Sequence, residues 1–291
     1  MKKIAIIGAA CGRGAQIKGC QDGPEVLRML DFFAPLHDSG INYFWDDVLH
    51  LPCGADGGAL HAVSGMCSIL AERVTFSLRS GYFPLVVGGD HSCAIGTWSG
   101  VDETIADTGE LGLLWVDAHM DSHTFSTTPS GAIHGMGLAC LLGYGERELT
   151  GIGLPTPKLL PGNVCLLGVR SFEAGEAALL KALGVRVYGM AEIQQRGFAA
   201  VFDEALARVQ RNTAGFGVSL DLDVLDPSEE PGVGSPEPGG IFKHELARAF
   251  HQLHHNPRFL AMEIVEYNPY LDCRFITAHA ACELFAAAAT G

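Results

Sequence analysis

Residues 111–121 read LGLLWVDAHMD, an apolar run that ends in alternating ionisable side chains. Asp117, His119 and Asp121 occupy every second position, so an extended backbone places all three on one face. At the end of a buried strand these groups would repel and desolvate one another unless a cation held them. The stretch predicts a core strand that ends in a metal site, although taken alone it also fits a solvated strand end.

Two further apolar runs end in a similar way. The segment SLDLDVLDP at residues 219–227 places Asp221 and Asp223 two positions apart. In VVGGDHS at residues 86–92, paired glycines let the backbone turn and aim His91 across the sheet edge. Taken alone, the DxD pair is a weak signal, and the glycine segment also fits a turn with a capping Asp or Ser. Because ligands bind at the carboxyl ends of strands in open α/β sheets, we expect the three strand ends to meet.

The whole chain alternates between short apolar runs and amphipathic stretches, which predicts a parallel sheet covered by helices on both faces. Glycine- and proline-rich segments at 143–162 and 227–240 indicate long loops, because the alternation continues beyond them, and we expect residues 1–291 to form one domain. The expected strands are 3–7, 84–87, 112–116, 164–168, 185–188, 216–220 and 259–265. The expected helices are 24–33, 59–79, 173–183, 199–211, 243–254 and 277–288.

The three motifs together supply two imidazoles, four carboxylates and no thiolate. An oxygen-rich set of this kind suits Mn²⁺, with Fe²⁺, Co²⁺ or Ni²⁺ as competitors, whereas structural zinc sites favour Cys and His. Six ligands are too many for one catalytic ion with an open position, but they fit two ions about 3.5–4 Å apart, a centre suited to hydrolysis. The predicted ligands are His91, Asp117, His119, Asp121, Asp221 and Asp223.

The charge balance narrows the choice of partners. With 33 Asp and Glu against 19 Lys and Arg, the formal net charge is −14, and no basic cluster occurs. Nucleic acids and anionic membranes both require basic surface, so neither is an expected partner. The nine cysteines are an odd number without CxxC spacing, mostly among apolar neighbours. This usage is typical of reduced, buried thiols and predicts a cytoplasmic location.

The motifs resemble those of a known family. GGDHS at 88–92, DAHMD at 117–121 and SLDLDVLDP at 219–227 are similar, in this order and spacing, to the signature segments of the ureohydrolases, the arginase and agmatinase superfamily. The resemblance extends from GAACGRG at 8–14 to MEIVEYNP at 262–269. It implies a three-layer α/β/α fold with a mainly parallel central sheet, a binuclear manganese centre formed by the six ligands, and hydrolysis of a guanidinium group.

Within the superfamily the chain most resembles the arginases. SGAIHG at 130–135 is similar to a loop whose His shuttles protons, which implies that His134 is a general acid and base. Glu266, in VEYNP, matches the carboxylate that pairs with the substrate guanidinium. The resemblance also implies substrate contacts from His123, Thr128, Ser130, Glu173 and Ser235.

Several of these positions depart from the arginase pattern. Ala132 and His123 replace Asn residues that orient the substrate's α-carboxylate, and Glu173 replaces an Asp near its α-amino group. Ser235 stands where a Thr is common. The departures concern substrate recognition rather than the metals. The residues therefore specify the type of reaction more firmly than they specify the substrate.

The expected function is hydrolysis of L-arginine, a small guanidino substrate, to L-ornithine and urea with two Mn²⁺ per chain. Alternatives are another ureohydrolase, namely an agmatinase, guanidinobutyrase, formimidoylglutamase or N-hydroxyarginine amidinohydrolase, and a non-catalytic binding or regulatory member of the fold. The resemblance also implies a homo-oligomer, a trimer or hexamer.

Overall fold

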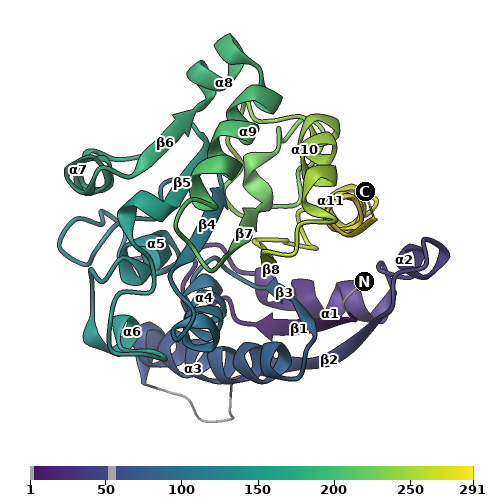
Figure 1. Ribbon diagram of the computed structural model, residues 1–291, viewed down its shortest axis with the longest axis horizontal. Helices are drawn as coiled ribbons and strands as arrows, with labels where there is room; N and C mark the ends of the chain where they lie inside the picture. The colour runs from purple at the N-terminus through teal and green to yellow at the C-terminus, as the bar shows by residue number, and fades with distance from the viewer. Residues whose placement is uncertain (1–2, 52–56, 291) are drawn as a thin grey trace.

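The computed structural model describes residues 3–51 and 57–290. Eight strands form one entirely parallel sheet in the order β2-β1-β3-β8-β7-β4-β5-β6 (Figure 1). The strands are β1 (Ile4–Ala10), β2 (Tyr43–His50), β3 (Phe83–Gly88), β4 (Leu111–Val116), β5 (Val164–Val169), β6 (Arg186–Gly189), β7 (Gly215–Asp221) and β8 (Phe259–Val265).

Helices cover both faces of this sheet. Figure 1 shows α3 and α4 on one side and α9, α10 and α11 on the other. The longer helices are α1 (Gly23–Met29), α3 (Gly58–Arg79), α4 (Cys93–Ile105), α7 (Ala174–Leu183), α8 (Met190–Arg196), α9 (Phe198–Val209), α10 (Lys243–Phe250) and α11 (Ile276–Thr290). The short helices are α2 (Pro35–Asp38), α5 (Gly137–Leu141) and α6 (Arg147–Thr150). The predicted three-layer α/β/α fold is confirmed.

Strand side chains alternate between two hydrophobic cores. In β3, Leu85 and Val87 join the core beneath α9, α10 and α11, whereas Val86 joins the core beneath α3 and α4. Every residue of β3, β4, β5 and β7 is buried, as expected for central strands of a parallel sheet covered on both faces. Double-sided burial explains why these strands read as continuous apolar runs.

Among the described strands and α-helices that the sequence did not predict, β2 and α4 are the longest, and the others are the helices α2, α5, α6 and α8. The strand β2 reads YFWDDVLH and lies at the sheet edge, where its partly exposed residues mix charged and apolar types. The helix α4 reads CAIGTWSGVDETI and is buried on nearly all sides, so it lacks the polar stripe that marks a surface helix. The helix expected at 243–254 is an α-helix only to Phe250 and continues as a 3₁₀ turn at His251–Leu253.

The described cysteines are free thiols. Seven are buried and Cys273 is exposed, while Cys53 lies outside the described residues. Burial raises the pKa of Cys11 to about 12 and that of Cys165 to about 12, which keeps both thiols protonated. Among the described helices, none has the length and apolar character needed to cross a membrane.

Close contact between α3 and α4 depends on glycine. A Cβ atom at Gly96 of α4 would lie 2.6 Å from the carbonyl oxygen of Cys67 in α3, whereas a Cβ atom at Gly65 of α3 would meet no atom within 4 Å. Both glycines are inside helices, so alanine brings the same gain in helix propensity to each.

We expect Gly96→Ala to lower the free energy of unfolding by about 1–3 kcal/mol, because the two helices must separate. The matched control Gly65→Ala should raise it by about 0.5–1 kcal/mol. Urea denaturation monitored by circular dichroism measures both changes. A Gly96→Ala protein as stable as wild type would contradict the packing argument.

Candidate metal centre

The strand order brings the sequence motifs together. In the sheet, β3, β8, β7 and β4 are consecutive neighbours, although they are far apart along the chain. Because all four are parallel, their carboxyl ends lie along one edge of the sheet. His91 follows β3, Glu266 follows β8, Asp221 ends β7 and Asp117 follows β4.

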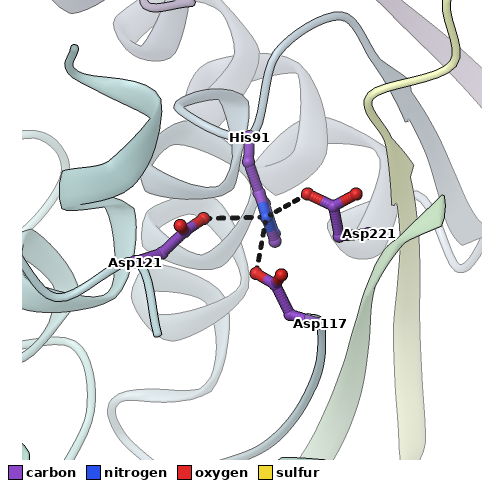
Figure 2. Close-up of side chains that lie close together, drawn as sticks. All are labelled: His91, Asp117, Asp121 and Asp221. Atoms are coloured by element: carbon purple, nitrogen blue, oxygen red, sulfur yellow. Dashed lines mark ion pairs between the residues drawn. The ribbon is translucent and has the colours of Figure 1, made fainter. Parts of the chain in front are cut away.

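One group of ligand-type side chains surrounds His91. Figure 2 shows carboxylates of Asp117, Asp121 and Asp221 pointing toward a single imidazole nitrogen. The His91 Nδ1 atom lies 3.2 Å from Asp117 Oδ2, 3.0 Å from Asp121 Oδ2 and 3.1 Å from Asp221 Oδ2. All four residues are buried. We call this set the inner group.

A second group shares one carboxylate with the first. His119 Nδ1 lies 2.9 Å from Asp223 Oδ2 and 3.5 Å from Asp117 Oδ1. Within each group the ligand atoms lie within 4.8 Å of one another. Asp117 therefore faces His91 with one oxygen and His119 with the other, so it would be a ligand in both groups. We call Asp117, His119 and Asp223 the outer group.

The donor set fits two divalent cations. Burial and the charges of Asp223 and Asp117 raise the pKa of Asp221. Burial disfavours a charged His119, yet the carboxylates of Asp223 and Asp117 together raise its pKa. Both upward shifts mark carboxylates that are too close together without positive charge between them, and metal ions supply that charge.

A buried network orients His91. Its Nε2 atom lies 3.0 Å from Ser219 Oγ, and the Ser219 hydroxyl donates to Glu263 Oε2 over 2.8 Å. Since that hydroxyl hydrogen is used, Ser219 accepts the Nε2 hydrogen of His91, and the Nδ1 lone pair is left facing the three carboxylates. The Trp115 ring stacks on His91 at 4.2 Å, and its Nε1 donates to Asp117 Oδ2 over 2.8 Å.

His134 and Glu266 form a pair beside the inner group. His134 Nδ1 lies 3.0 Å from Glu266 Oε1, which also accepts the His91 backbone N–H over 2.9 Å. Although burial opposes charge on the ring, Glu266 raises the pKa of His134 to about 10. Both Glu266, at φ 67°, and Asp121, at φ 45°, have left-handed backbone conformations, which non-glycine residues adopt at a cost. This strain lies at the proposed reaction centre.

A polar cavity of about 210 Å³ opens beside the centre. It is lined by metal-ligand candidates, by His134 and by all five predicted substrate contacts, and Ala132 also lies in its wall. Glu266 is buried and is not in the lining, but it bonds to His134, which is. The five predicted contacts in the wall are His123, Thr128, Ser130, Glu173 and Ser235.

Two polar side chains of the lining, those of Gln16 and Glu176, were not predicted from the sequence. Glu173 and Glu176 form a reciprocal capping box at the start of α7, in which each carboxylate accepts the other residue's backbone N–H. The E-x-x-E spacing before an apolar helix is the sequence signal that marks Glu176. His123, Glu173 and Glu176 also lie within 4.8 Å of one another, but backbone N–H groups and the imidazole already bond to the two carboxylates.

A larger cavity of about 360 Å³ lies at the other end of the sheet, near the starts of β1, β3 and β8. Its wall is mainly apolar, with Phe83, Phe259 and Phe285, and includes His254 and His255 but no carboxylate. The chemistry therefore belongs to the smaller cavity.

Comparison with known proteins decides the family, since a sequence model of the Arginase family matches residues 2–291. The chain belongs to the arginase family. An arginase from Brevibacillus brevis is 40% identical over 289 residues, which cover 97% of this chain and 96% of that protein. The crystal structure of arginase from Bacillus subtilis has a TM-score of 0.92 at 37% identity, and the match covers 100% of this chain and 99% of that one.

A solved formimidoylglutamase from Bacillus subtilis is more distant. At 24% identity and a TM-score of 0.79, over 100% of this chain and 87% of that one, it shares the fold. Membership of the arginase family makes this chain a hydrolase of the guanidino C–N bond, as the three motifs predicted.

The network around His91 generates a test. In Ser219→Ala, the Nε2 hydrogen of His91 loses its acceptor, so we expect the affinity for Mn²⁺ to fall about 10–100-fold. Competition with a fluorescent chelator measures this affinity. The exposed substitution Ser39→Ala serves as a control, and an unchanged affinity in Ser219→Ala would refute the orienting role.

Proposed function

We propose that this enzyme hydrolyses L-arginine to L-ornithine and urea at two Mn²⁺ ions. The observation that carries the proposal is the pair of ligand groups that share Asp117 and open onto one cavity. We call the part of this cavity that is lined by Thr128, Ser130, Glu173 and Glu176 its outer end. The inner group would hold one ion and the outer group the other. When bound, the two ions supply a water activated for attack on the guanidinium carbon.

Glu266 and His134 complete the reaction centre in this proposal. Glu266 balances the positive charge of the substrate guanidinium. His134 bonds to Glu266 through Nδ1, so its Nε2 is free to carry a proton to the departing amine of ornithine. Although burial opposes charge on the ring, the Glu266 carboxylate raises the pKa of His134, which favours a proton on the ring.

The outer end of the cavity suits an α-amino acid. The exposed hydroxyls of Thr128 and Ser130 lie 3.4 Å apart and would donate to the α-carboxylate. The carboxylates of Glu173 and Glu176 would receive the α-ammonium group. The arginase relatives support arginine as the substrate. Ala132 and His123, which replace Asn residues, keep an altered guanidino substrate as the second candidate.

We also infer the setting in which the enzyme works. One sheet contains all eight described strands, which supports a single domain over residues 1–291. A cytoplasmic location agrees with the free, mostly buried cysteines. A trimer or hexamer would cover exposed apolar side chains at the end of α1 and in the segment before α11, two segments that approach each other where the Phe32 and Phe275 rings lie 5.5 Å apart. These exposed side chains are Met29, Leu30, Tyr270, Leu271 and Phe275.

Protein loaded with Mn²⁺ should release urea from L-arginine, and removal of the ions by a chelator should abolish the release. Asp223→Ala should lose metal and nearly all activity, because it removes a carboxylate from the outer group. Plasma mass spectrometry of metal per chain, paired with a urea assay, checks both results. Metal-replete wild type that releases no urea from arginine would refute the proposed reaction.

His134→Asn should separate proton transfer from metal binding. We expect kcat to fall about 10²–10⁴-fold while two metal ions per chain remain bound, because His134 is not in either ligand group. Steady-state kinetics and metal analysis on the same sample test this. Loss of metal from this variant would show that His134 acts structurally instead.

A further inference from the structure

His123 lies between the substrate cavity and the start of α7. Only 6% of the residue is exposed, and both of its ring nitrogens face protein groups. Nε2 lies 2.9 Å from Glu173 Oε2 and 3.6 Å from Glu176 Oε1, while Nδ1 lies 3.1 Å from Thr127 Oγ1. With both nitrogens engaged, the ring has no free donor to offer a substrate carboxylate.

Among the described residues of the cavity wall, Glu173 and Glu176 have the only carboxylates that belong to neither the inner nor the outer group. Glu176 is fixed, since it is buried and its oxygens accept the backbone N–H groups of Glu173 over 2.9 Å and Ser122 over 3.4 Å. The Glu173 side chain accepts the backbone N–H of Glu176, yet it is 59% exposed, so its carboxylate remains open to a ligand. A cationic group at the outer end of the cavity therefore competes with His123 for Glu173.

We propose that His123 is a specificity-determining residue that holds Glu173 in a hydrogen bond which the α-ammonium group of the substrate must replace. This inference rests on the proposed function and deepens it. His123 weakens the binding of guanidino compounds that carry an ammonium group at the outer end, relative to compounds that lack one. Asparagine at this position is too short to reach Glu173 and leaves that carboxylate available.

The test compares wild type with His123→Asn, both loaded with Mn²⁺. The probes are L-ornithine and 5-aminopentanoate, which has the same chain and carboxylate but no α-ammonium group. By calorimetry, the Kd for L-ornithine should fall about fivefold in the variant, the scale of one partly exposed ion pair. The Kd for 5-aminopentanoate should stay within about twofold. The KM for L-arginine should fall by the same factor as the Kd for ornithine.

A second variant identifies Glu173 as the partner. In a Glu173→Gln background the α-ammonium group has no carboxylate at this position to pair with, so adding His123→Asn should bring no further gain for L-ornithine. A gain that persists in this background would overturn the proposal, because His123 would then act through another group.

Three other results would also overturn the proposal. Weaker binding of both probes to His123→Asn would show that His123 contacts the carboxylate. Equal tightening of both probes would show a general effect on cavity shape, and no change in either would show that the ring has no role. Calorimetry requires no turnover, so an enzyme that binds ornithine but releases no urea from arginine would refute the proposed reaction and leave the role of His123 standing.

Discussion

The structure depends on keeping four carboxylates together in a buried site. Asp117, Asp121, Asp221 and Asp223 are at most 6% exposed and lie around two imidazoles. Without cations these groups oppose folding, because burial and mutual repulsion both disfavour their charged forms. Two divalent ions would change the formal charge from −14 to −14 + 4 = −10 and place the added charge where the repulsion is greatest. Metal binding and stability of the sheet edge are thus coupled.

The elements behind the ligands fix them from several directions. Ser219 and Glu263, on neighbouring strands β7 and β8, hold one side of His91, and Trp115 of β4 stacks on its ring. Arg170, which follows β5, donates to the backbone carbonyl groups of Asp223 and Val224 and so secures the turn after β7. Each contact joins segments that are distant in sequence, so the metal geometry is a property of the assembled sheet rather than of any one motif.

The difference between a local motif and a contact made by the assembled sheet explains what could be predicted from the sequence. The ligands of β4 and β7 were predictable because alternation on an extended backbone is a local signal. Glu266 was assigned only through the family resemblance, since its position beside His91 follows from β8 lying between β3 and β7, which no local pattern records. Glu176 was missed because its signal is a capping box, which indicates a helix start rather than a binding residue. Likewise, β2 was missed because edge exposure gives it a mixed pattern.

The site has two acidic regions, which are the metal-ligand groups and the outer end of the cavity. The carboxylates of each region have different partners, so catalysis and substrate specificity depend on different residues. Metal ions can neutralise the negative charge of the inner and outer groups. A substitution in either group therefore removes the metal and the activity together. Outside them, the carboxylate of Glu173 is held by a hydrogen bond to His123, a residue of the protein itself. Replacement of His123 alters how well the cavity binds the ammonium group of a substrate and does not disturb the metal ions. The departures from the arginase pattern at His123, Ala132 and Glu173 all lie in this outer region, where the fold tolerates change.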